Sequence, residues 1–184
     1  MDLQKLSQEA FETAKAHGWH DKELPDETYL MLIITEIAEA VQADRKNRHA
    51  DIARFKECMN ALERVGDDWF MTAFAEHIKN SVEDELADIL VRCFDLYALR
   101  GIDIPNEKSF KAKKTLELPP FPVFAYALAC EATAAFYNLK IILYFIVGHV
   151  ILYCRQKNID IDFFVEQKMR YNKLRDYKHG NNKY

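Results

Sequence analysis

Residues 30 to 41 read LMLIITEIAEAV, and only Thr35, Glu36 and Glu39 in this stretch are polar. A helix that is apolar nearly all round is buried in its protein. Glu36 and Glu39 are three residues apart, so a helix places both carboxylates on one face. Two acids on a buried face repel each other and lose hydration, so they need a cation or basic partners unless they are protonated. The stretch predicts a buried helix that carries an acidic site.

A second stretch, residues 84 to 99, reads DELADILVRCFDLYAL. Glu85, Asp88, Arg92 and Asp95 fall at i, i+3, i+7 and i+10, and they form one polar stripe on an otherwise apolar helix. Glu85 and Asp88 repeat the spacing of the first acidic pair. Two such helices packed side by side present four carboxylates to one place, where a hard divalent cation such as Mg²⁺ takes oxygen ligands.

The composition favours a single all-α domain. The chain has 184 residues, 49% of them hydrophobic, with only 5 Gly and 5 Pro. So few turn residues indicate long helices, and no glycine-rich phosphate loop is present, which disfavours Rossmann-type and P-loop nucleotide binding. Periodicity and breakers predict helices at 3–17, 26–46 (with Asp26 as N-cap), 50–64, 69–99 (with a break near Asn80), 123–136, 138–157 and 160–175.

We divide this domain, residues 1–184, into three parts. Residues 1–104 hold both acidic helices, 105–158 are a connector with apolar helices, and 159–184 form a basic helix and tail. The bundle is completed either by residues 119–158 or by a second subunit in a homodimer. A faint repeat is one interpretation of the apolar part, in which Ile142 and Phe145 stand where the acidic half has Glu85 and Asp88.

Charge and cysteine usage bear on partners and location. The net charge is −4, and the last thirty residues carry eight Lys or Arg against four Asp or Glu, which favours a local anion site over a nucleic-acid surface. Four scattered cysteines and a start without an apolar segment predict a cytoplasmic protein. Residues 141–154 are apolar but shorter than the roughly 20 residues of a bilayer span. We expect a core helix with a hydrogen-bonded His149, and a membrane-peripheral anchor is the weaker alternative.

The acidic pairs match a family pattern. Glu36-Ile37-Ala38-Glu39 and Glu85-Leu86-Ala87-Asp88, with the flanks TEIAEAVQADRK and DELADILVRCFDLYALRGID, resemble the E-x-x-E and E-x-x-D motifs of the MazG-like all-α nucleoside triphosphate pyrophosphohydrolases. The ending KMRYNKLRDYKHG is similar to a K-x-x-x-N-x-x-R-x-x-x-H-G ending of some members. The likeness covers about 26–46, 83–104 and 160–180, whereas the spacer from Glu39 to Glu85 is long and 105–158 is an apparent insertion.

The resemblance implies an activity and a site. The activity is hydrolysis of a nucleoside or deoxynucleoside triphosphate to the monophosphate and pyrophosphate. Mg²⁺, with Mn²⁺ as a possible substitute, is held by Glu36, Glu39, Glu85 and Asp88, and one carboxylate accepts the proton of the attacking water. Glu39 is our candidate for that base.

Other side chains have a functional and a structural interpretation. Lys168, Asn172 and Arg175 share one helix face and form either a triphosphate clamp or an exposed basic helix end. Arg92 binds phosphate or pairs with Asp88 or Asp95. Trp19 stacks on a base or simply packs. The alternative for the whole chain is a non-catalytic helical interaction protein whose acids are a relic or a structural metal site.

Overall fold

The computed structural model describes residues 1–60, 66–111, 118–134 and 138–178, and within these ranges the chain is helical and has no strand. This confirms the all-α prediction. The elements are α1 (Leu3–Ala16), α2 (Asp26–Arg45), α3 (Ile52–Met59), α4 (Asp67–His77), α5 (Val82–Leu99), the 3₁₀ turn η1 (Glu107–Ser109), α6 (Phe121–Ala132), α7 (Leu139–Gln156) and α8 (Ile161–Lys173).

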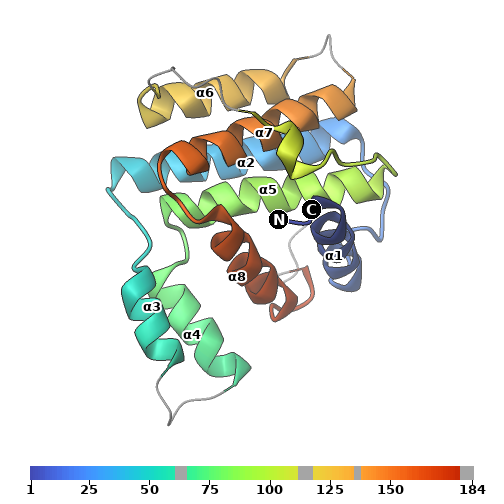
Figure 1. Cartoon of the computed structure of the whole chain (residues 1–184). Coiled ribbons are helices and arrows are strands. Elements are labelled where there is room, and N and C mark those ends of the chain that lie inside the picture. Colours follow the sequence, from blue (N-terminus) through green and yellow to red (C-terminus); the bar gives the residue numbers. More distant parts are fainter. Residues whose placement is uncertain (61–65, 112–117, 135–137, 179–184) are drawn as a thin grey trace.

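Four of the helices form a bundle. Helix α2 packs on α5 and α6, and α7 packs on the same two helices, so the four contacts make a closed ring. Figure 1 shows α6 and α7 layered over α2 and α5. Leu86, Ile89 and Leu90 of α5 and Leu143 and Ile146 of α7 are fully buried in this arrangement. The bundle is therefore completed within the chain by the segment 119–158, and a homodimer stays a separate prediction.

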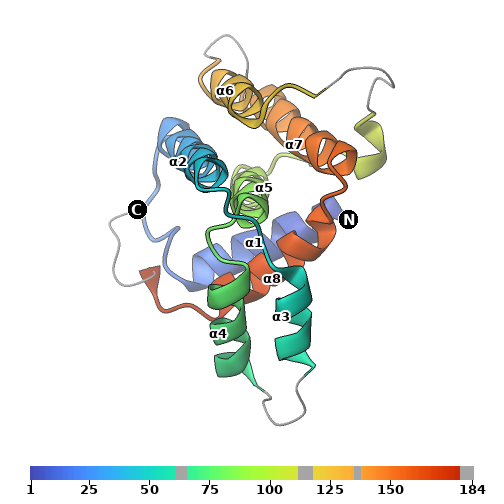
Figure 2. The ribbon, with the colours of Figure 1, turned by 90° about the vertical axis from the view of Figure 1, so that its left-hand side faces the viewer.

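The other side of α5 is covered by helices from the two ends of the chain. Helices α1 and α8 both pack on α5, and Figure 2 shows them crossing beneath the bundle. The Ser7 hydroxyl of α1 donates a buried hydrogen bond of 2.7 Å to the backbone carbonyl of Phe94 in α5. Helices α3 and α4 form a projecting hairpin, and α4 leans on α8. Helix α5 thus lies between two layers.

The predicted helix 69–99 is two helices. Asn80 has a φ of 59°, a left-handed conformation that ends α4 and that Asn tolerates better than most residues. Ser81 then caps α5 by accepting a hydrogen bond from the backbone N–H of Asp84 at 3.2 Å. The predicted N-cap of α2 was wrong, because Pro25 occupies the cap and Asp26 lies in the first turn. Asp26 instead accepts a hydrogen bond from the Nε of Arg100 at 2.6 Å.

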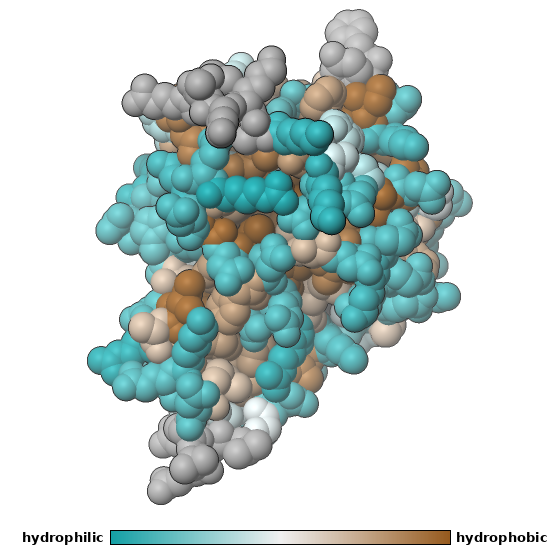
Figure 3. Space-filling view, viewed as in Figure 1, coloured by the Kyte–Doolittle hydropathy of each residue, from teal (hydrophilic) through white to brown (hydrophobic). Residues whose placement is uncertain are grey.

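Helix α7 is the one described helix that is long and apolar enough to cross a membrane, and half of its residues are buried inside the protein. Those buried residues face α5, α6 and α8. The prediction for His149 was wrong: this residue is exposed and stacks on Phe145, with 6.0 Å between the ring centroids. Ile141 and Tyr144 are also exposed, and hydrophobic side chains show between hydrophilic ones over the upper part of Figure 3.

Candidate functional site

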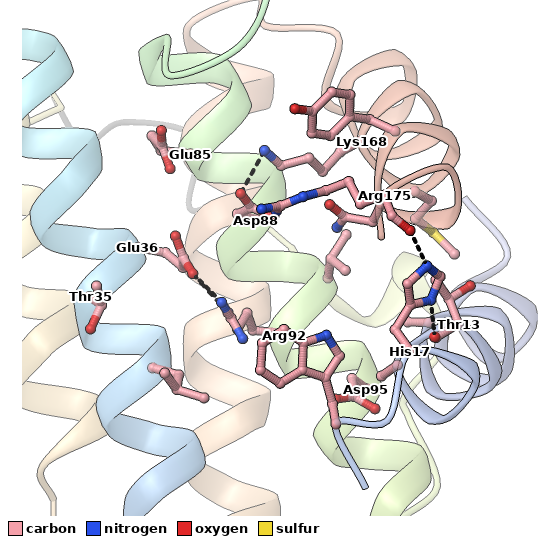
Figure 4. A pocket seen from close by; sticks show the side chains of 18 of the residues that line it. Thr13, His17, Thr35, Glu36, Glu85, Asp88, Arg92, Asp95, Lys168 and Arg175 are labelled. Carbon is pink, nitrogen blue, oxygen red and sulfur yellow. Dashed lines mark hydrogen bonds and ion pairs between the residues drawn. The ribbon is translucent and has the colours of Figure 1, made fainter. Parts of the chain in front are cut away.

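A cavity of about 340 Å³ opens where α1, α2, α5 and α8 meet. Helices α2 and α5 form its acidic wall, and α8 with the turn after it forms the opposite wall (Figure 4). All of the site residues predicted from the sequence line this one cavity. They are Trp19, Glu36, Glu39, Glu85, Asp88, Arg92, Lys168, Asn172 and Arg175.

Three of the four predicted metal ligands converge. Glu36, Glu39 and Glu85 each offer a carboxylate oxygen, and these three oxygens lie within 4.8 Å of one another. Glu36 and Glu85 are buried, whereas Glu39 is exposed. The Oε2 atom of Glu85 is buried with no hydrogen-bond partner among the described residues. An all-carboxylate donor set with an unpaired buried oxygen fits a hard divalent cation.

Asp88, the fourth predicted ligand, is held by a lysine. The Nζ of Lys168 lies 2.6 Å from Asp88 Oδ2 and 2.8 Å from Asp84 Oδ1, and the Lys168 side chain is only 6% exposed. Since a buried ammonium needs paired charge, Lys168 fits the role of a structural cation for these two aspartates better than that of a mobile phosphate clamp. The three residues of the predicted clamp thus line the cavity, but Lys168 is already paired with two aspartates.

Arg92 has a different partner from either that we predicted. Its Nε and Nη2 atoms both lie 2.7 Å from Glu36 Oε1, which joins α5 to α2 across the acidic wall. Figure 4 shows this ion pair between Glu36 on α2 and Arg92 on α5. Because both nitrogens contact the same oxygen, Glu36 Oε2 keeps its lone pairs for another ligand. The guanidinium therefore orients Glu36 through one carboxylate oxygen and leaves the other oxygen able to bind a ligand.

Burial keeps protons on this acidic wall. Desolvation, followed by the negative charge of Asp88, raises the pKa of Glu36 to about 7 and that of Glu85 to about 9. Desolvation also raises the pKa of Asp84 to about 6, although Lys168 opposes it. Burial lowers the pKa of Lys168, but Asp88 and Asp84 outweigh that effect and raise it above the ordinary value. The buried carboxylates of this wall are therefore more stable when a proton or a metal cation neutralises their charge.

The other end of the cavity is aromatic. Trp19 is half-buried and lines it together with Tyr29. His20 Nε2 donates a hydrogen bond of 2.7 Å to Asp95 Oδ1, and the His20 ring stacks on Phe11 with 5.3 Å between centroids. Along α5 the stripe thus runs from carboxylates at Glu85 to a mixed polar and aromatic end at Asp95. Ten residues of helix separate these ends by about 15 Å.

Arg175 supplies an available cation. Its backbone carbonyl lies 2.8 Å from His17 Nε2, which ties the turn after α8 to α1. Its side chain reaches into the cavity toward Asp88 (Figure 4), and no carboxylate of the described residues is within ion-pair distance of the guanidinium. The predicted His179-Gly180 end of the family motif lies outside the described residues.

Sequence reasoning missed Asp84 and the pairing of His20 with Asp95. Asp84 stands beside Glu85 in an acidic first turn, where helix N-termini commonly carry exposed acids, and yet it is 1% exposed. The backbone N–H of Asn80 donates a hydrogen bond of 2.8 Å to Asp84 Oδ2, and the charge of the buried carboxylate is balanced by Lys168 on α8, 84 residues later. The sequence offered no signal for that contact.

Comparisons with protein-family models, with curated proteins and with solved structures found no match to this chain. The assignment of a function therefore rests on the residues and their geometry.

Proposed function

We propose that this chain is a Mg²⁺-dependent pyrophosphohydrolase of the MazG-like all-α type, which converts a nucleoside or deoxynucleoside triphosphate to the monophosphate and pyrophosphate. The observation that carries the proposal is the convergence of Glu36, Glu39 and Glu85 within 4.8 Å, with a buried Glu85 oxygen that lacks a partner. Carboxylates that are desolvated and gathered in a cavity are typical of sites that do chemistry.

In this proposal the three glutamates hold Mg²⁺. When bound, the cation supplies charge neutralisation at the phosphate oxygens and lowers the pKa of a bound water. Glu39, the exposed member, accepts a proton from the water that attacks the α-phosphorus. The new bond joins the water oxygen to the α-phosphorus, and the bond from that phosphorus to the α–β bridging oxygen breaks. Pyrophosphate leaves with the bridging oxygen.

The remaining side chains bind and orient. Arg175 offers a planar guanidinium that suits two phosphate oxygens at once. Arg92 holds Glu36 in place through the 2.7 Å ion pair. Lys168 keeps Asp88 and Asp84 in the wall and acts as a positioning residue. Trp19, at the aromatic end, offers a face on which a base stacks.

Product analysis tests this function. Purified protein is incubated with Mg²⁺ and each member of a panel of nucleoside and deoxynucleoside triphosphates, and the products are separated by anion-exchange chromatography. We expect equal amounts of monophosphate and pyrophosphate from at least one substrate, also with Mn²⁺, and loss of both in Glu36→Gln. A folded, Mg²⁺-loaded protein that turns over no nucleotide would favour the non-catalytic alternative.

A further inference from the structure

A second hollow continues from the three glutamates in the direction away from the aromatic end. Its volume is about 230 Å³, and Glu39 and Glu85 line both it and the main cavity. Its α2 wall consists of Glu39, Gln42, Ala43 and Lys46, at i, i+3, i+4 and i+7 on one helix face. Glu39 and Glu85 therefore stand at the junction of two hollows.

The far end of this second hollow is basic. It is lined by Lys46, which follows the last residue of α2, and by Arg48. Arg48 Nη2 donates a hydrogen bond of 2.8 Å to the backbone carbonyl of Lys79, which fixes the guanidinium at the rim. Neither Lys46 nor Arg48 has a carboxylate of the described residues within ion-pair distance. Both cations are thus available to an anion.

The distance along α2 between Lys46 and Glu39 allows both side chains to contact one bound anion and its cation. Seven residues separate it from Glu39, which is about 10 Å of helix axis. Side chains on a helix lean toward its N-terminus, and Lys46 lines the same hollow as Glu39, so its ammonium can approach that carboxylate from the C-terminal end of α2. A small group that carries several negative charges, such as pyrophosphate, suits the hollow of about 230 Å³ between the ammonium and the carboxylates once a cation neutralises the latter.

We propose that Lys46 and Arg48 bind the β- and γ-phosphates of the substrate and then the leaving pyrophosphate, so that the triphosphate straddles the three glutamates. This inference rests on the proposed function, because it places the nucleoside on the other side, toward Trp19. It also adds two cations to Arg175 for the phosphates, since Lys168 is engaged with Asp84 and Asp88. Since Glu39 and Glu85 line the same hollow, pyrophosphate binds there only together with the metal.

Calorimetric titration of pyrophosphate into the protein, with and without Mg²⁺, tests this site without any turnover. We expect Mg²⁺-dependent binding in the wild type and a Kd for pyrophosphate about tenfold weaker in Lys46→Gln and in Arg48→Gln, the loss expected for one charge-assisted contact. Titration of a nucleoside monophosphate should give the same Kd in all of these proteins. The matched control is Arg45→Gln, which removes an exposed charge next to Lys46 that lines neither hollow.

The outcomes separate the two proposals. Pyrophosphate affinity that is equal in Lys46→Gln, Arg48→Gln and Arg45→Gln would overturn the phosphate site, even if the wild type hydrolyses nucleotides. Pyrophosphate binding that depends on Lys46, by a protein that hydrolyses no nucleotide, would support the phosphate site and overturn the proposed function. In an active enzyme, Lys46→Gln should also raise the KM for the triphosphate about tenfold.

Discussion

Helices α5 and α7 are built alike and yet differ in chemistry. Both have 18 residues, and each begins after a side-chain cap, Ser81 or Asn138. The two helices end alike as well. A left-handed residue, Gly101 or Asn158, follows each of them, and the next backbone N–H, of an isoleucine in both cases, bonds at 2.9 Å to a carbonyl of the last helical turns.

The faces of these two helices differ at matching positions, 57 residues apart. Four positions of the polar stripe on α5 correspond to apolar or uncharged residues on α7. The pairs are Glu85 with Ile142, Asp88 with Phe145, Arg92 with His149, and Asp95 with Leu152. Helix α7 shows that a helix of this length and these caps packs in the bundle without buried acids. The acids of α5 lower stability when they are ionised, and this is why we assign them a function.

The largest expected effect is a loss of turnover that a substitution on α5 causes and a matched substitution on α6 does not. Glu85→Gln removes a proposed metal ligand and should lower turnover about a thousandfold, because an uncharged amide holds Mg²⁺ poorly. Glu131→Gln, on α6 in the other layer, is the matched control and should leave turnover unchanged. Initial rates at saturating Mg²⁺ measure both. Equal rates for Glu85→Gln and wild type would contradict the site.

A core truncation in each helix should cost the same. Leu86 and Leu143 occupy matching positions and are fully buried, so changing either to Ala should lower the free energy of unfolding by about 2–5 kcal/mol. Urea denaturation measures the loss. A small loss for Leu143→Ala alone would mean that α7 does not pack in the bundle, as a peripheral membrane anchor requires.

The pH dependence of metal binding has a definite sign. The pKa values of about 7 for Glu36 and about 9 for Glu85 mean that both are largely protonated at pH 6. Metal must displace those protons, so Mg²⁺ affinity should rise about a thousandfold from pH 6 to pH 8, roughly tenfold through Glu36 and roughly a hundredfold through Glu85. Calorimetry in buffers of different ionisation enthalpy counts the released protons. An affinity that is flat over this range would refute the buried, protonated state.

The same pKa values govern the stability of the metal-free protein. The pKa values of Glu36 and Glu85 in the folded protein both lie above the ordinary value for a carboxyl group. The folded protein therefore binds more protons than the unfolded chain between about pH 4.5 and 9. Stability should therefore fall as pH rises through this window. Glu85→Gln should lessen that fall and raise the Tm at pH 8 by several degrees. A Tm in Glu85→Gln below that of the wild type at pH 8 would contradict this assignment.

The smallest expected effect is a packing detail peculiar to α7. Gly148 matches Val91 on α5, and a Cβ at Gly148 would stand 2.7 Å from Cδ1 of the buried Phe110 ring. Gly148→Ala should destabilise the protein by about 1 kcal/mol, because overpacking outweighs the gain in helix propensity. Thermal unfolding against wild type measures it, and an increase in Tm would show that the ring moves freely.

The acidic site was readable from the sequence because its signal is local. Glu36, Glu39, Glu85 and Asp88 interrupt two apolar runs at helical spacing, and periodicity is sufficient to place acids on a face. The α8 residues were singled out only because their motif resembles that of a family, and Trp19 only because aromatic side chains stack on bases; the structure brings all of them to the same cavity.

The charge pairing was not readable, because it depends on contacts between distant helices. Lys168 could have faced solvent or phosphate, and only the packing of α8 on α5 places it between Asp84 and Asp88. Arg92 was expected to pair within its own helix, but the proximity of α2 gives it Glu36. The end of α4 near Asn80 was anticipated as a break, whereas the second, basic hollow was not.

Hydrolysis in ¹⁸O-labelled water tests the central claim most directly. The wild-type protein is incubated with Mg²⁺ and its best nucleotide substrate, and both products are analysed by mass spectrometry. Our account predicts one ¹⁸O atom in the monophosphate and none in the pyrophosphate, since water attacks the α-phosphorus, with no product from Glu36→Gln. Label in pyrophosphate, release of inorganic phosphate as the primary product, or equal turnover by Glu36→Gln would contradict it.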